Sequence, residues 1–162
     1  MTVLETIVDF LNGIGIETVE GHVPDSSFLP GVRIEGGRVV YDRAMPWPGD
    51  LLHEAGHLAT APAALRSGLS DDVGLPASVP HATEAEATAW AYAAIRHLGL
   101  DPAVLFHQGG YHGASAQLLA TYGAGVYLGA PGLAQAGMTA VGAAVPGSGA
   151  AHYPNMSRWL RS

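Results

Sequence analysis

The sequence predicts an α+β fold in which a small, mostly antiparallel sheet packs against several helices. Two β-branched runs in residues 31–42 flank Glu35-Gly36-Gly37, a pattern typical of a β-hairpin. After residue 48, apolar residues recur at helical spacing in several segments. The chain has 162 residues, which is enough for one domain with a hydrophobic core, so we predict a single domain over residues 1–162.

Before the hairpin, the chain predicts one helix and one short strand. Residues 2–11 carry an apolar stripe that ends at Asn12-Gly13, and residues 15–19 alternate weakly between apolar and polar. Residues 22–30 are rich in proline and serine and predict a loop.

After the hairpin, the chain is expected to be mainly helical. Pro62 and Gly99 are expected to end the first two long helices. Residues from 123 onward are diluted by glycine and predict no element until a short helix near the C-terminus. The expected helical segments are 49–60, 63–66, 83–98, a short helix that begins at Asp101-Pro102, 114–122 and 153–160.

The composition argues against several classes of protein. The net charge is −7 without any basic run, which argues against nucleic acid as a partner. There is no cysteine, so His, Asp, Glu or water must hold any metal. The first residues lack a basic region, unlike a signal peptide, and Pro131 and Pro146 interrupt the Gly/Ala-rich residues 123–151 before they could span a membrane. We therefore expect a cytoplasmic protein that binds neither nucleic acid nor membrane.

The motif His53-Glu54-Ala55-Gly56-His57 is the strongest functional signal in the chain. Residues four apart lie on one face of a helix, so His53 and His57 can present two imidazoles to one metal ion, with zinc the expected ion. Glu54 can then take a proton from a water on that ion. The flanking residues are apolar and predict a buried helix, where unpartnered polar groups would be costly. Gly56 weakens a helix, which indicates close packing at that position.

A catalytic zinc site needs a third protein ligand, and the candidates are Glu84 and Glu86 at the start of the next long helix. Local rules explain both residues without a metal. Thr83-x-x-Glu86 is a capping-box pattern, and Glu84 lies in a first helical turn, where the helix dipole favours an acid. The residues alone leave the choice between them open.

The segments Arg38–Asp42, Leu51–Leu58 and Glu84–Ala91 together resemble the ImmA/IrrE-type zincin-like metallopeptidases. The likeness covers residues 31–98 and leaves out the Gly/Ala-rich C-terminal part. It implies a zincin-like fold and a zinc site of the gluzincin type, with His53, His57 and Glu86 as ligands and Glu84 as the alternative third ligand. The strand at residues 38–42 ends just before the motif helix, so it is either an edge for an extended substrate or an ordinary strand of the sheet.

The implied activity is hydrolysis of peptide bonds in a peptide or protein substrate, with Glu54 as the catalytic base. Such a site also needs a donor for the oxyanion, and Tyr111 and His112 are favoured because a glycine-flanked loop can approach the metal closely. The other candidate donors are His107, His152 and Tyr153. The alternative function is a zincin-fold metal-binding regulatory or protein-interaction module without peptidase turnover, and hydrolysis of a non-peptide amide is a further rival. No G-x-S-x-G elbow and no phosphate-binding loop occur in the sequence.

Overall fold

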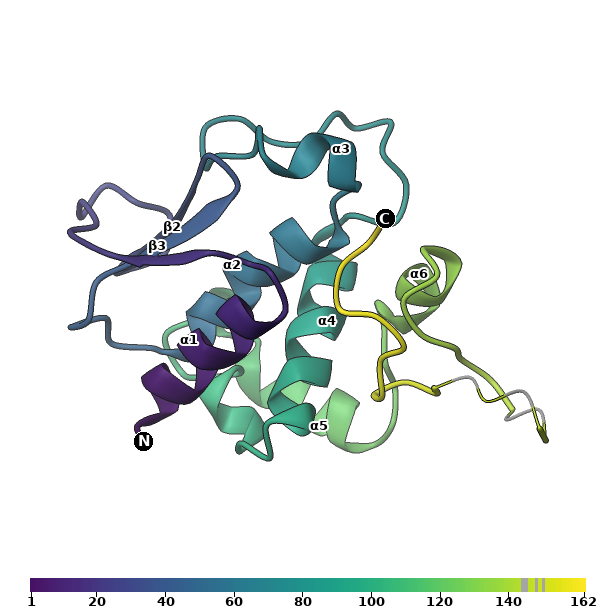
Figure 1. Ribbon diagram of the computed structural model, residues 1–162. Coiled ribbons are helices and arrows are strands. Elements are labelled where there is room, and N and C mark those ends of the chain that lie inside the picture. Colours follow the sequence, from purple (N-terminus) through teal and green to yellow (C-terminus); the bar gives the residue numbers. More distant parts are fainter. Residues whose placement is uncertain (144–145, 148, 150) are drawn as a thin grey trace.

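Two helices, α2 (Gly49–Thr60) and α4 (Glu84–His97), form the centre of the fold. A computed structural model describes residues 1–143, 146–147, 149 and 151–162. The sheet packs against α2, while α6 (Ala130–Gln135) packs against α4, so the helix pair lies between them (Figure 1). The predicted α+β class is therefore confirmed, and α2 has the predicted bounds.

The close approach of α2 and α4 depends on small residues. A Cβ atom added to Gly56 would lie 2.6 Å from the carbonyl oxygen of Ala87, which is too close for any side chain. Ala87, Ala91 and Ala94 on α4 are fully buried. This confirms the prediction that close packing explains the glycine of the motif, and it brings the first turn of α4 close to the motif histidines.

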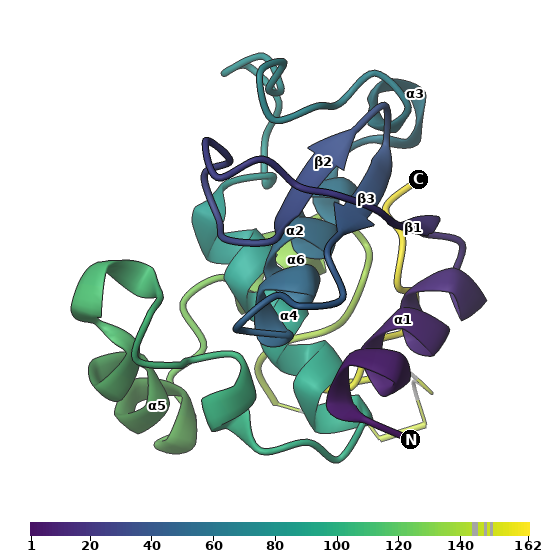
Figure 2. The same cartoon turned by 90° about the vertical axis from the view of Figure 1, so that its left-hand side faces the viewer.

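The sheet has three strands, β1 (Thr18–Glu20), β2 (Val32–Glu35) and β3 (Arg38–Tyr41), in the order β1-β3-β2 (Figure 2). The hairpin is confirmed: β2 and β3 are antiparallel, and Gly36 and Gly37 in the turn have φ of +57° and +75°, as a two-residue hairpin turn requires. Because β1 pairs with β3 in parallel, the sheet is mixed rather than mostly antiparallel. Of the two interpretations of residues 38–42, the ordinary strand is confirmed and the substrate-binding edge is wrong, because β3 is the central strand and is paired on both sides.

The outer side of β2 is partly covered by the loop that follows α3 (Ala63–Arg66). The amide of Ile34 donates to Asp71 Oδ1 at 2.8 Å, and the amide of Asp71 donates to the carbonyl of Ile34 at 3.1 Å. At this point the strand has no free backbone groups for a further strand.

The remaining elements surround the central pair. Helix α1 packs on α2 and begins with a capping box between Thr2 and Glu5. In Figure 1, helix α5 lies below the lower end of α4. The bounds of these elements are Val3–Gly13 for α1, Pro102–Val104 for η1, Tyr111–Gly113 for η2 and Ser115–Gly123 for α5.

The C-terminal segment differs from the prediction. Residues 153–160, all of which the structure describes, form an irregular strap of turns and bends rather than a short helix. Their backbone groups bond to other parts of the chain: the carbonyl of Trp159 accepts from the indole of Trp90 at 2.9 Å, and the amide of Ser157 donates to the carbonyl of Met138 at 2.9 Å. These tertiary bonds take the place of the bonds that a local helix would make.

Within the described residues, no helix is long and apolar enough to cross a membrane. The expectation for residues 123–151 falls in part on residues 144, 145, 148 and 150, which lie outside the described residues.

Candidate metal centre

The two histidines of the motif converge on one point beside α2. Four residues make slightly more than one turn of helix, so the imidazoles lie one above the other. Their Nε2 atoms are 3.3 Å apart and their rings are nearly perpendicular, at 86°. His53 is buried and His57 is half-buried. The sequence prediction that both imidazoles can face one ion agrees with this geometry.

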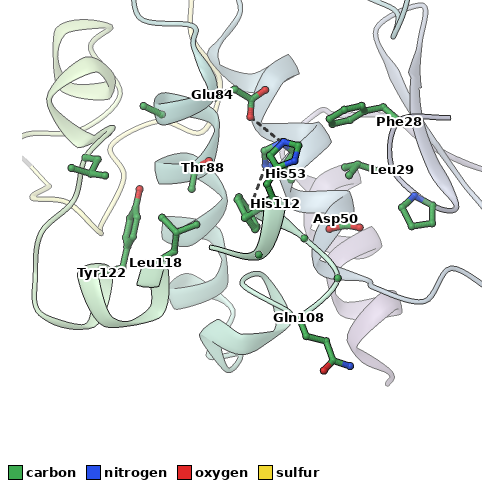
Figure 3. A pocket seen from close by; sticks show the side chains of 17 residues that line it. Phe28, Leu29, Asp50, His53, Glu84, Thr88, Gln108, His112, Leu118 and Tyr122 are labelled. Atoms are coloured by element: carbon green, nitrogen blue, oxygen red, sulfur yellow. Dashed lines mark hydrogen bonds and ion pairs between the residues drawn. The ribbon is translucent and has the colours of Figure 1, made fainter. Parts of the chain in front are cut away.

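Glu84, in the first turn of α4, lies against both imidazoles. Its Oε2 is 3.3 Å from His53 Nε2, and its Oε1 is 3.0 Å from His57 Nε2. Figure 3 shows the carboxylate directed at His53 from the neighbouring helix. Three potential ligands from two helices therefore meet at one place.

Glu86 is directed elsewhere. Its Oε2 accepts from the amide of Thr83 at 3.1 Å and also from the Thr83 hydroxyl, which completes the capping box. Its other oxygen lies against Gly132 of α6, where a Cβ would collide with it. Residues two apart on a helix are separated by about 200° around the axis, so only one of the two glutamates can face the histidines. Of the two candidates for the third ligand, Glu84 is therefore the one that lies against both imidazoles.

Glu54 completes the group. One carboxylate oxygen of Glu54 and one ring nitrogen each of His53 and His57 all lie within 4.8 Å of one another. Glu54 is only 7 % exposed, and this burial raises its pKa to about 7, against the opposing effect of the two imidazoles. A carboxylate of this pKa can both take up and release a proton near neutral pH.

The carboxylate of Glu84 and the imidazole of His57 form a charge pair. Hydrogen bonds from His53 and His57 hold the pKa of Glu84 well below its usual range. Burial lowers the pKa of His57, but the hydrogen bond and the negative charge of Glu84 outweigh it and raise the pKa overall. The pair thus favours an ionised Glu84 and a positive charge between it and the histidines.

Tyr111 lies behind the first histidine. Its hydroxyl is 3.3 Å from His53 Nδ1, and the two rings meet edge to face with centroids 5.5 Å apart. This contact leaves Nε2 of His53 directed at His57 and Glu84. A partner on the second ring nitrogen of a metal-binding histidine fixes the orientation and the tautomer of the ring. Tyr111 was predicted as an oxyanion donor, and the structure places it where it can orient His53.

The other predicted oxyanion donors lie in different places, one at the pocket and the rest away from it. His112, at a φ of +51°, lines the same pocket as Tyr111. His107 is buried and bonds to Asp50, and the Tyr153 hydroxyl donates to the carbonyl of Ala89 at 2.8 Å. His152 forms an isolated bridge with Ala140.

His53 and Glu84 open onto a pocket of about 730 Å³. Phe28 and Leu29, from the loop before β2, form one side of it, and Leu118 and Tyr122 of α5 form the other (Figure 3). Apolar walls around a few converging polar groups are typical of a binding site.

Asp50 also lines the pocket, although it was not among the site residues predicted from the sequence. The signal that could have revealed it is its spacing: Asp50 and His53 are three residues apart, which places them on the same face of α2. Figure 3 shows His53 between Asp50 and Glu84 in that view.

Comparisons with protein-family models, with curated proteins and with solved structures found no match to this chain. The resemblance to ImmA/IrrE-type metallopeptidases therefore depends on the motif residues alone and stays a prediction.

Proposed function

We propose that this protein is a zinc-dependent peptidase of the zincin type, in which His53, His57 and Glu84 hold the ion and Glu54 is the catalytic base. The observation that carries the proposal is the convergence of three ligand groups from α2 and α4 beside a buried carboxylate, at the wall of a large pocket. Glu84 replaces Glu86 as the third ligand in this proposal.

The spacing of the three groups fits a zinc ion. Bonds of about 2.0–2.1 Å place two ligand atoms of a tetrahedral site roughly 3.3–3.4 Å apart. The distance between the two histidine nitrogens is 3.3 Å, and each of them lies near a different oxygen of Glu84, at 3.3 Å for His53 and Oε2 and at 3.0 Å for His57 and Oε1. Two imidazoles and one carboxylate are also a donor set found in catalytic zinc sites that leave one position for water.

When bound, zinc would supply the Lewis acidity that lowers the pKa of a coordinated water. The protein residues perform the remaining steps. Glu54 accepts a proton from the attacking water and delivers it to the leaving amine, for which a pKa near neutrality is suited. Tyr111 keeps the imidazole of His53 in position during the reaction. The pocket beside His53 would hold the side chains of the peptide between its two apolar walls.

The proposal is tested by measuring zinc in protein purified without a metal-affinity tag, together with cleavage of a mixed peptide library. We expect about one zinc per chain and cleavage that is lost in Glu54→Gln while the zinc remains. Zinc without cleavage in the wild type would favour a metal-binding regulatory or interaction module instead. Absence of zinc, even after incubation with the metal, would refute the site.

A further inference from the structure

Asp50 is a buried carboxylate that is only half satisfied. It lies in the first turn of α2 and is 3 % exposed. Its Oδ1 is 2.7 Å from His107 Nε2. Its Oδ2 is buried and has no hydrogen-bond partner in the part of the chain that the structure describes. Asp50 as a whole lines the pocket, so a molecule bound there is placed to complete the hydrogen bonding of this carboxylate.

The surrounding residues hold this carboxylate rigidly. The amide of Gly109 donates to His107 Nδ1 at 3.1 Å, so the other ring nitrogen carries the proton and donates to Asp50. The indole of Trp47 stacks on the imidazole, with centroids 4.4 Å apart and an angle of 5°. Gly109 has no room for a side chain, because a Cβ would lie 2.6 Å from Trp47 Nε1. The Ser115 hydroxyl also donates to the carbonyl of His107.

The hydrogen-bonding chemistry of Asp50 Oδ2 limits the kind of ligand that it can bind. An ionised carboxylate only accepts hydrogen bonds, so the ligand must be a donor, and a positively charged donor makes the stronger bond. Among the described residues that line the pocket there is no lysine or arginine to offset the charge of Asp50, whereas Glu84 already faces the histidines. The charge of the pocket walls therefore favours a cationic nitrogen over a neutral amide.

We propose that Asp50 binds a cationic nitrogen of the substrate and thereby sets a preference for positive charge beside the cleaved bond. The position of that bond rests on the function proposed above. Asp50 and His53 are one helical turn apart, with Cβ atoms about 5–6 Å from each other, so the cation belongs to a residue next to the cleaved bond. Its source is either the substrate's α-ammonium group or a lysine or arginine side chain.

The first test does not depend on zinc or on cleavage. Binding of n-butylammonium and of the neutral n-butanol is followed by NMR, with the Gly109 amide and the Trp47 indole N–H as reporters. We expect saturable binding of the ammonium that is roughly tenfold or more tighter than binding of the alcohol. If the wild-type protein binds both molecules equally, or does not bind the ammonium, the proposal is overturned without the need for a variant.

Asp50→Asn is the matched variant. Its Oδ1 can still accept from His107, while Oδ2 becomes an amide that donates, so the fold is retained and the ligand preference is lost. We expect an unchanged thermal midpoint and loss of the preference for n-butylammonium. A preference that survives in Asp50→Asn would show that another group binds the cation.

The second test uses the zinc-loaded protein and separates the two sources of charge. Cleavage is compared for matched peptides that carry lysine or norleucine beside the cleaved bond, each with a free or an acetylated N-terminus. If Asp50→Asn abolishes a preference for lysine, the cation that Asp50 binds is the lysine side chain. If the variant abolishes a preference for the free N-terminus, the cation is the α-ammonium group. A cleaving enzyme without any charge preference contradicts the proposal. Failure of the peptidase function itself appears as absent zinc or absent cleavage, while the NMR result still decides the role of Asp50.

Discussion

Burial of Glu54 predicts a stability that falls as the pH rises in the metal-free protein. The folded protein raises the pKa of this carboxyl from 4.5 to about 7, because charging it inside α2 costs desolvation. The stabilising effect of the protonated form is fully present below the pKa of the unfolded chain. It is lost as the pH rises through the pKa of the folded state.

Glu54→Gln removes this titration, so the comparison of variant and wild type isolates it. The pKa shift corresponds to about 3 kcal/mol of unfolding free energy between low and high pH. Because Glu54 is only 7 % exposed, solvent screening reduces this figure little. We expect the two proteins to have similar stability near pH 4 and the variant to be more stable by up to about 3 kcal/mol at pH 8.

The assay is urea unfolding at several pH values after zinc has been removed with a chelator. Glu17→Gln, at an exposed position before β1, gives the baseline for removing a surface carboxylate. If the difference between Glu54→Gln and the wild type stays constant from pH 4 to pH 8, the carboxylate is not desolvated. The reasoning about its acid–base role would then fail.

Four further predictions concern the helix pair and the residues around the candidate metal site. Glu84→Gln should weaken zinc binding by more than roughly tenfold, measured by competition with a chelating dye, because it removes a ligand. Glu86→Gln should instead retain zinc affinity, because Gln can take the place of Glu in the capping box with Thr83, and the reverse pattern would assign the ligand to Glu86. Tyr111→Phe should lower zinc affinity on the order of tenfold by releasing His53 Nδ1, and equal affinity would exclude that role. Gly56→Ala should lower the thermal midpoint by an amount that corresponds to about 1–3 kcal/mol, since its Cβ would meet the backbone of α4; an unchanged midpoint would show that the helices can move apart.

The helices up to residue 123 and the hairpin could be predicted because their signals are local, whereas α6 lies in the glycine-rich region where no element was predicted. Glycines in the turn set the hairpin, and Pro62 follows the end of α2. The spacing of the motif placed both imidazoles on one side of a helix before any tertiary structure was known. The C-terminal strap could not be predicted, because its conformation depends on bonds to Trp90 and Met138 in distant parts of the chain.

The sequence by itself determined the pair His53 and His57 and the neighbouring Glu54, since one turn of helix is enough to bring them together. The sequence also limited the candidates for the third ligand to Glu84 and Glu86 at the start of α4. Only the tertiary structure decided which glutamate faces the histidines, because that depends on how α4 is rotated against α2 and on the contact of Glu86 with α6.

The contacts of Tyr111 with His53 and of His107 with Asp50 are likewise tertiary. Tyr111 and His53 are 58 positions apart in the chain, and His107 and Asp50 are 57 positions apart. Local spacing carries no information about such pairs, because packing of the loop after α4 against the side of α2 brings them together. The candidate metal group His53, Glu54 and His57 was therefore determined by sequence, whereas the pocket around it and the unpaired oxygen of Asp50 were determined by the packing of distant segments.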